Sequence, residues 1–517
     1  MNTKKFILII SVVLALVSCD SFLDVVPDNR AEIDTDEKIT KLLTSGYPDY
    51  IFPFMTEMMS DNADDRGTLA SAYSVLQEEM YRWKDIMEIG NESPKSVWES
   101  YYASIAIANH ALRAIEEQGS PERLNPQRGE ALMIRAYHHF YLVNVFGKHY
   151  SASTGETDLG ITYIEEPETT VSPEYERESV AAIYRKIERD IEEALPLMDD
   201  NIYSVPKYHF NRKAAYAFAA RFYLFYRKYD KVIAYANEVF GEHPERILRD
   251  MTKISSVQQE YAPIAEDYVK AEKDANLFII APKSTICTIF GNYSTGKKYS
   301  HSRYLAQTET VMTNGPWGTY ASGLFRMPAL SYSSGLYVAN AKLPYYFEYT
   351  DPVARIGYRH TVYVALTTDE LLLCRAEAYI MQQKYDEATE DLALWMSRHT
   401  ASANVLTRQR INDYYSALDY YTPTQPTVKK ALHPEVPIVS DEQENFLQCL
   451  LHIRRIETLH EGLRWFDIKR FGIVIYRRYL DENLEVTVTD ELGVDDPRRA
   501  IQLPNAVISA GYPPNPR

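Results

Sequence analysis

Apolar residues recur every three or four positions along most of the chain, which is the period of an amphipathic α-helix. The clearest stretch runs from Val180 to Leu195, where isoleucines repeat at this spacing and charged residues fill the opposite face. Ser179 stands directly before it, and serine is a favourable N-cap. The same spacing predicts helices over residues 96–118, 127–146, 211–227, 230–240, 368–382, 386–398 and 441–460. Thr367 and Glu370 have the spacing of a capping box at the start of one of these helices.

Two of the predicted helix pairs share residues at a constant offset in sequence number. The matched positions are Ala220 and Ala376, Tyr223 and Tyr379, Lys228 and Lys384, Tyr229 and Tyr385, and Asp230 and Asp386. A small residue lets two helices approach closely, and an acidic residue favours the positive end of the helix that follows. Each unit therefore resembles a tetratricopeptide repeat. Two degenerate units are fewer than a solenoid needs, so other helix pairs are expected to complete the array.

The stretch 241–366 lacks this helical period. Short apolar runs at 277–280, 286–290 and 361–366 alternate with turn-rich aromatic segments, which predicts loops and small strands packed on the helical scaffold. We therefore expect three parts in the body of the protein. They are an N-terminal helical part (19–240), a loop-rich, ligand-facing insertion (241–366) and a C-terminal helical part (367–517).

The N-terminus has the features of an export signal. Lys4 and Lys5 precede an apolar run of about 12 residues, which is shorter than the roughly 20 that a membrane-spanning helix needs. The run ends in Leu16-Val17-Ser18-Cys19, which resembles a bacterial lipobox. We expect cleavage of residues 1–18 and lipidation of Cys19, so that the protein meets the membrane only through this lipid anchor.

The net charge and the cysteine spacing argue against nucleic-acid binding, a disulfide framework and a cysteine metal site. The formal net charge is −17, which argues against a nucleic-acid partner, because phosphates attract a basic face. Three other cysteines, Cys287, Cys374 and Cys449, lie far apart in the sequence. This spacing suits neither a disulfide framework nor a CxxC metal site, so free buried thiols are predicted.

Several segments together resemble the SusD/RagB family of nutrient-binding lipoproteins from the outer membrane of Bacteroidetes. The most typical are DELLLCRAEAY at 369–379, EGLRWFD at 461–467 and DPRR at 496–499. Further matches occur at 135–148, 157–161 and 175–190, so the resemblance extends over essentially the whole chain. The segment Asp391 to Trp395 departs from the usual family text.

The resemblance implies a mostly α-helical protein. Its four tetratricopeptide-like helix pairs would form a right-handed scaffold, with a loop-rich lobe that contains a few short strands. It also implies a lipoprotein on the cell surface that covers a SusC-like TonB-dependent transporter of the outer membrane. The ligand would be an oligosaccharide or, in some branches, a peptide, and no cofactor is implied.

Candidate ligand-binding residues follow from the chemistry of sugars. A sugar ring has an apolar face edged by hydroxyl groups, so its site needs an aromatic ring beneath and polar side chains at the edge. One segment offers Asp61, Asn62, Asp65, Arg66 and, downstream, Trp83. A second offers Tyr293, Arg303, Asn314, Trp317 and Tyr320, with Trp317 as the leading candidate. The resemblance supports both regions without matching single residues.

Other polar residues are predicted to serve the scaffold. The acidic cluster at 61–65 suggests Ca²⁺, but it lacks the order of an EF-hand loop, so a solvated turn is expected and no metal site is predicted. Arg375 and Glu377 should pair with neighbouring helices. Arg454, Arg455, Glu457 and Glu461 have helical spacing, which predicts ion pairs on the surface or between helices. His138 and His139 lack partners at metal-ligand spacing and are expected to be core or surface histidines.

Two other functions remain as alternatives to ligand capture. A glycoside hydrolase needs two carboxyl groups across a cleft, which the neighbours Asp64-Asp65 and Glu165-Glu166 do not supply. No G-x-S-x-G nucleophile motif occurs either, so no catalytic residues are predicted. The second alternative is a helical-repeat scaffold lipoprotein with only protein partners. Stabilisation by a small ligand would distinguish capture from this scaffold role.

Overall fold

The computed structural model describes residues 33–168, 175–294, 296–333, 335–483 and 485–517. The predicted signal peptide (1–18) and Cys19 lie outside the described residues. The helices that precede the loop-rich stretch are α3 (Asp36–Leu43), α4 (Pro53–Met59), α5 (Val75–Tyr81), α6 (Pro94–Glu117), α7 (Asn125–Phe146), α8 (Val180–Ala194), α9 (Arg212–Phe225) and α10 (Tyr229–Phe240). Those within it are α11 (Tyr261–Tyr268), α12 (Cys287–Phe290) and α13 (Arg303–Thr308). Those that follow it are α14 (Thr368–Met381), α15 (Tyr385–His399), α16 (Arg408–Ser416), α17 (Asp441–Glu457), α18 (Arg464–Arg470) and α19 (Asn505–Ser509).

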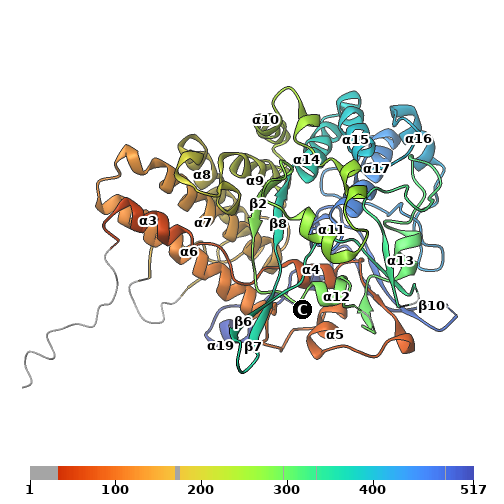
Figure 1. The fold of residues 1–517 in the computed structure, drawn as a ribbon, viewed down its shortest axis with the longest axis horizontal. Helices are drawn as coiled ribbons and strands as arrows, with labels where there is room; N and C mark the ends of the chain where they lie inside the picture. The colour runs from red at the N-terminus through yellow and green to blue at the C-terminus, as the bar shows by residue number, and fades with distance from the viewer. Residues whose placement is uncertain (1–32, 169–174, 295, 334, 484) are drawn as a thin grey trace, which may run out of the picture.

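The helices form one continuous array. Figure 1 shows α3, α6, α7 and α8 on one side, α14 to α17 on the other, and α9 with α10 between them. Every helix predicted from the apolar spacing is present, with ends within three residues of the expected positions. The prediction of a mostly α-helical fold with a few short strands is confirmed. No helix among the described residues is both long and apolar enough to cross a membrane.

The two repeat units fold alike. In each, a helix, a tight turn and a second helix follow one another, as α9–α10 and as α14–α15. The turns have the same backbone shape, because Arg227 and Gln383 both adopt φ = 61°. Helix α14 also packs against both α9 and α10, so the two units are direct neighbours in the array. The constant offset in the sequence therefore corresponds to a structural repeat.

Two helices begin at the N-cap residues predicted from the sequence, but the predicted capping box is incomplete. Ser179 accepts a hydrogen bond from the Ala182 amide (3.1 Å), as expected of an N-cap. Thr367 likewise caps α14 by accepting from the Glu370 amide (3.1 Å). The Glu370 side chain does not complete the predicted capping box. It pairs instead with Arg221 (2.9 Å) and Arg454 (3.1 Å) inside the core, because a buried guanidinium needs a charged partner.

Small sheets occupy the loop-rich part and the C-terminal hairpin. The strands are β1 (Asp64–Asp65), β2 (Asn276–Ile280), β3 (Tyr299–Ser300), β4 (Leu330–Tyr332), β5 (Tyr337–Ala339), β6 (Tyr346–Asp351), β7 (Ile356–His360), β8 (Tyr363–Thr367), β9 (Ile475–Leu480) and β10 (Val486–Leu492). One sheet has the order β10-β9-β1-β3, and three pairs are β2-β8, β4-β5 and β6-β7. Strands were expected at 277–280 and 361–366, where β2 and β8 lie.

The apolar run 286–290 is helical rather than a strand. Helix α12 follows Thr285, whose amide and hydroxyl both donate to the buried carboxylate of Glu92 (2.8 and 2.6 Å). These contacts fix the turn that begins the helix. A run of five residues is too short to carry a period that separates a strand from a buried helix, so this element could not be assigned from the sequence.

The residues predicted to serve the scaffold lie between helices. Arg375 pairs with Asp391 of α15 (2.7 Å), and Glu377 pairs with Arg470 of α18 (2.5 Å), as expected. Arg454 and Arg455 are also buried, so surface ion pairs are excluded for them. His138 and His139 are core residues of α7, and each Nδ1 bonds the carbonyl four residues earlier. Cys287, Cys374 and Cys449 are free and buried, as predicted.

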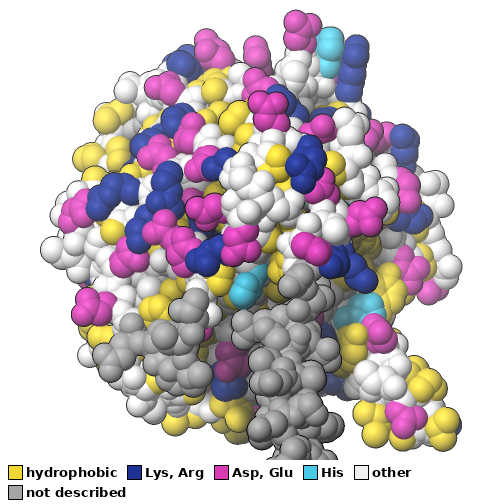
Figure 2. All heavy atoms as spheres, turned by 90° about the vertical axis from the view of Figure 1, so that its left-hand side faces the viewer, with side chains coloured by type: hydrophobic (Ala, Val, Ile, Leu, Met, Phe, Trp, Pro, Cys, Tyr) yellow, Lys and Arg dark blue, Asp and Glu magenta, His cyan; other side chains and the backbone are white. Residues whose placement is uncertain are grey.

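The outer face of the N-terminal helices carries mixed charge. Figure 2 shows Lys and Arg side chains interspersed with Asp and Glu across the part of this face that is not grey. A nucleic-acid-binding face would instead gather its basic residues into a patch or stripe. On the visible part of this face, basic and acidic side chains are mixed instead.

Candidate functional site

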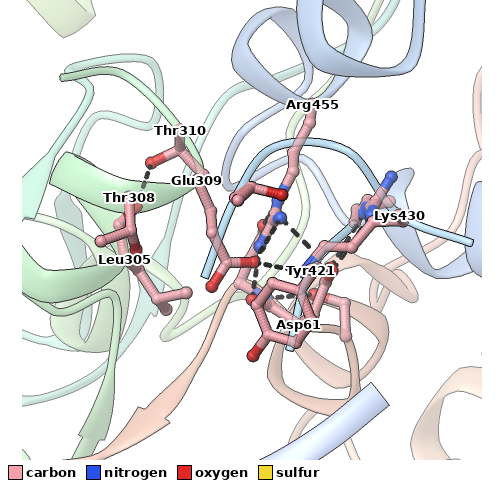
Figure 3. A network of polar contacts seen from close by, with 12 residues as sticks. Asp61, Leu305, Thr308, Glu309, Thr310, Tyr421, Lys430 and Arg455 are labelled. Carbon is pink, nitrogen blue, oxygen red and sulfur yellow. Dashed lines mark hydrogen bonds and ion pairs between the residues drawn. The ribbon is translucent and has the colours of Figure 1, made fainter. Parts of the chain in front are cut away.

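The first predicted binding segment forms part of a buried ionic core. Asp61 accepts two hydrogen bonds from the Arg464 guanidinium (2.9 and 3.0 Å), and its side chain is only 9% exposed. Glu309 accepts from Lys430 (2.6 Å) and from Arg455 (2.9 Å). Figure 3 shows Asp61, Glu309, Lys430 and Arg455 converging from chain segments that lie far apart in the sequence. We define Asp61, Glu309, Lys430, Arg455 and Arg464 as the ionic core.

Charge compensation within the ionic core is strong. Burial alone would raise the pKa of Glu309, but Lys430, Arg478 and Arg455 lower it to about 2. Burial likewise opposes the charged form of Asp61, yet Arg455 and Arg464 hold its pKa well below the usual range. The cavity beside these groups has a volume of about 10 Å³, which is room for at most one water molecule. A sugar ring therefore has no space here.

The other candidates of this segment are also internal. Asn62 is fully buried and bonds Glu57 (3.1 Å) and Arg455 (2.9 Å). Asp65 accepts from the Gly67 amide (2.9 Å). Arg66 lies 5.4 Å from the ring centre of Tyr337.

Trp83, the last candidate of this group, is 2% exposed. Its indole donates to the Met59 carbonyl (2.8 Å), and the Arg477 guanidinium lies 4.1 Å from the centre of its ring. Both faces and the polar edge are thus occupied by protein. The expected solvated turn at 61–65 is wrong, because β1 of this segment is an inner strand between β9 and β3.

Trp317 supports the second segment from below. It is 1% exposed, its Nε1 donates to the Thr313 carbonyl (3.2 Å), and its ring packs edge-on against Phe325 (5.3 Å between centroids). Gly315 and Gly318 exchange two backbone hydrogen bonds across the turn (3.1 and 2.8 Å). A side chain at Gly315 would collide with the Trp317 ring, so this turn requires glycine there. Trp317 thus presents no face to a ligand in this structure. It packs instead against Phe325.

A cavity of about 340 Å³ opens above this support. The residues that line it are Ile254, Gln259, Val311, Tyr320, Ser322, Gly323, Phe325, Arg326, Pro328 and Ala329. We call it the Tyr320 cavity. Its volume falls within the range of about 300–1,000 Å³ that is typical of small-molecule sites. Phe325, which lies on Trp317, forms one wall.

Tyr320 is the predicted residue that lines this cavity, whereas Asn314 and Arg303 are not among its lining residues. The Tyr320 amide donates to Asn314 Oδ1 (2.8 Å), and Asn314 itself is exposed. Burial raises the pKa of the Tyr320 phenol, while the positive charge of Arg303 opposes this shift. Arg303 begins α13 and is exposed.

The wall combines apolar and hydrogen-bonding groups. Tyr320, Phe325 and Pro328 offer apolar surface, whereas Gln259, Ser322 and Arg326 offer donors and acceptors. The Arg326 Nε donates to the Thr400 carbonyl (3.0 Å), which fixes the guanidinium in position. No carboxylate belongs to the described residues that line this cavity, so the acid–base pair of a hydrolase is missing from it.

Tyr293 lies elsewhere on the surface. It is 52% exposed, and its ring centroid is 4.8 Å from that of Tyr345, so the two form an accessible aromatic pair outside the Tyr320 cavity. The cavity residues Gln259 and Arg326 were missed in the sequence. Neither stands in an aromatic or acidic cluster, so no local signal marks them.

Comparison with known proteins agrees with the fold. A family described as starch-binding and associating with the outer membrane matches residues 21–224, and the SusD family matches residues 292–500. No curated protein matches the chain.

Solved structures of similar shape come from Bacteroides species. A SusD superfamily protein from Bacteroides thetaiotaomicron is 19% identical, with a TM-score of 0.62 and coverage of 93% of this chain and 100% of that one. One from Bacteroides fragilis is 17% identical (TM-score 0.62; 93% and 98% covered). A SusD-like carbohydrate-binding protein from Bacteroides vulgatus is 15% identical (TM-score 0.58; 92% and 96% covered). At such identities these likenesses establish the fold.

Proposed function

The chain belongs to the SusD/RagB family, and from this premise we propose that it captures oligosaccharide or peptide nutrients at the surface of the outer membrane. It hands them to a SusC-like TonB-dependent transporter and has no catalytic role. Cys19 carries the lipid anchor. The lipobox-like run that ends at Cys19 and the carbohydrate-binding relative of the same fold support this proposal.

The Tyr320 cavity is the single observation that carries the proposal. Tyr320 is partly exposed and lines the cavity together with the amide of Gln259, the hydroxyl of Ser322 and the guanidinium of Arg326. A sugar stacks its apolar face on an aromatic ring and bonds its hydroxyl groups to such edge groups. We expect shallow binding with a Kd in the micromolar range, because one stacked ring contributes only about 0.5–1.5 kcal/mol beyond burial.

A thermal-shift screen of the full chain in detergent tests the proposal. The panel holds plant, host and microbial glycans together with peptide pools. A ligand present at 100 times its Kd adds about 2.7 kcal/mol to the free energy of unfolding, which raises the midpoint by several degrees. The same ligand is then measured on Tyr320→Ala and on Tyr73→Ala, which removes a tyrosine that is 49% exposed and is not among the lining residues.

The two variants decide where the ligand binds. Loss of the shift in Tyr320→Ala alone assigns binding to the cavity. An equal shift in both variants would show that the ligand binds elsewhere. A blank panel together with co-purification of protein partners alone would favour the scaffold role.

A further inference from the structure

A histidine and two carboxylates converge at the ends of three helices beneath the Tyr320 cavity. Asp369 lies in the first turn of α14, while His399 and Glu457 are the last residues of α15 and α17. One ligand atom from each lies within 4.8 Å of the other two. The His399 Nε2 is 3.2 Å from Glu457 Oε2 and 3.6 Å from Asp369 Oδ1. All three side chains are at least nine-tenths buried.

The histidine is oriented with its free nitrogen toward the carboxylates. Its Nδ1 lies 3.0 Å from the Trp395 carbonyl, which can only accept, so Nδ1 carries the proton. The Nε2 of His399 therefore faces the two carboxylates. A metal ion between these groups would be bound by all three, and a histidine metal ligand usually makes a second hydrogen bond through its other ring nitrogen, as Nδ1 does here.

Polar atoms at this position lack hydrogen-bond partners. Neither the Nε2 of His399 nor the Oδ2 of Asp369 has one. A small cavity of about 20 Å³ adjoins the cluster, and His399, Glu457 and Asn340 line it. The Oδ1 of Asn340 is buried and unpartnered as well. The cavity is large enough for one water molecule or one ion.

Two basic side chains lie beside the cluster. The Arg249 Nε is 3.6 Å from Asp369 Oδ2, and the Lys342 Nζ is 3.6 Å from Glu457 Oε1. Lys342 is shared with Glu461, at 3.2 Å. Three carboxylates and two basic side chains thus surround this position. The Trp395 indole donates to Glu457 Oε2 (2.8 Å) and holds that carboxylate in place.

We propose that Asp369, His399 and Glu457 bind one divalent transition-metal ion, with Zn²⁺ as the best match. One imidazole nitrogen and two carboxylate oxygens form a donor set that suits Zn²⁺ or Mn²⁺, whereas Ca²⁺ prefers oxygen ligands alone. The Asn340 amide oxygen or a water molecule completes the coordination. The ion fastens α14, α15 and α17 together. Val311 and Phe325 line both this cavity and the Tyr320 cavity, so the ion also supports the wall of the ligand site.

Metal stoichiometry tests this inference independently of nutrient binding. The full chain is treated with a chelator, dialysed, and equilibrated with Zn²⁺, Mn²⁺ or Ca²⁺ alone. After gel filtration, the bound metal is counted by plasma mass spectrometry. We expect one Zn²⁺ per chain, which Mn²⁺ replaces at higher concentration, and no retained Ca²⁺.

Two variants locate the ion. His399→Gln should lose the stoichiometric Zn²⁺ and the rise in melting temperature that Zn²⁺ gives the parent protein. His243→Gln is the control, because it removes an exposed histidine that pairs with Glu245 (3.1 Å) and should retain full binding. Equal binding by both variants would place the ion elsewhere and overturn the assignment.

If His399→Gln does not fold, the unmodified protein can still be tested by metal binding. Loading with Co²⁺ should give the visible absorption bands of a low-symmetry site with nitrogen and oxygen ligands, and Zn²⁺ should displace them. A chain that retains neither Zn²⁺ nor Co²⁺ would overturn the assignment. That result would leave the proposed nutrient binding untouched.

Discussion

Two segments look equally suited to ligand binding in the sequence. In the structure, one is buried and the other borders a cavity. Residues 60–67 and 314–320 both combine polar side chains with turn-forming residues and nearby aromatic rings. The first lies in the ionic core, where the nearest cavity holds at most a water molecule. The second borders a cavity of about 340 Å³. The difference lies in what the rest of the chain brings to each segment.

Distant partners explain the burial of the first segment. Arg464, which pairs with Asp61, is 403 positions away in the sequence. Arg455 and Lys430 also come from the C-terminal part and leave no hydration shell around the carboxylates. Residues 314–320 meet few such partners, so Asn314 and Tyr320 remain accessible. An acidic loop therefore indicates a ligand site only where buried Lys or Arg side chains do not already neutralise its carboxylates.

Removal of Asp61 should give the largest effect on stability. In Asp61→Ala, the Arg464 guanidinium loses both of its carboxylate hydrogen bonds inside the protein. Breaking a buried ion pair in this way costs about 3–5 kcal/mol. Urea unfolding of the full chain, followed by circular dichroism, measures the change.

Glu99→Ala is the matched control for this prediction. Glu99 pairs with Lys95 on the surface (2.9 Å), and its side chain is 59% exposed. Such a pair contributes at most about 1 kcal/mol. A cost for Asp61→Ala no larger than that of Glu99→Ala would mean that residues 60–67 are free to meet a ligand.

Acid should weaken the same region by a slightly smaller amount. The pKa of Glu309 is about 2 in the folded protein, below its ordinary value of 4.5. A lowered pKa adds stability that is fully present above pH 4.5 and is lost as the pH falls through 2. Between about pH 5 and pH 2, the parent chain should therefore lose about 3 kcal/mol more than Glu309→Gln does.

Urea midpoints across this range supply the measurement. Glu309→Gln is less stable at neutral pH but has no carboxylate to protonate at this position. Parallel curves for the two proteins would contradict the inference that Glu309 is charged and paired inside the fold.

The helices could be predicted from the sequence because their signals are local. The stretch that begins at Val180 repeats its apolar residues at helical spacing, and Ser179 caps it, so α8 ends within one residue of the prediction. The run 286–290 is too short for a period, and its helical form depends on Glu92, almost 200 positions earlier. Short elements are thus decided by tertiary contacts that sequence spacing does not contain.

The candidate site was predictable only in part, for the same physical reason. Asn314 and Tyr320 share one turn, and their mixture of aromatic and polar groups is visible in the sequence. Trp317 belongs to the same turn, but its burial depends on Phe325 and His452. Local composition reveals which groups are available, whereas their exposure depends on packing.

Arg326→Ala should weaken ligand binding while sparing the fold. A hydrogen bond from a charged donor contributes about 1.5 kcal/mol, so the Kd of a glycan from the screen should rise about tenfold. Isothermal titration measures it. Arg113→Ala serves as the control, because it removes an arginine from an exposed ion pair with Glu166 (2.8 Å). An unchanged Kd in Arg326→Ala would remove this wall of the cavity from the binding site.

The smallest effect is expected at Asn314, where two substitutions separate position from contact. Asn314 Oδ1 holds the Tyr320 amide, so Asn314→Ala should loosen the turn and raise the Kd two- to fivefold, which corresponds to about 0.5–1 kcal/mol. Asn314→Asp keeps an acceptor oxygen at the same place and should retain the parent affinity. If both variants weaken binding equally, the lost amide group itself contacts the ligand, and Asn314 is a ligand-binding residue rather than a support for Tyr320.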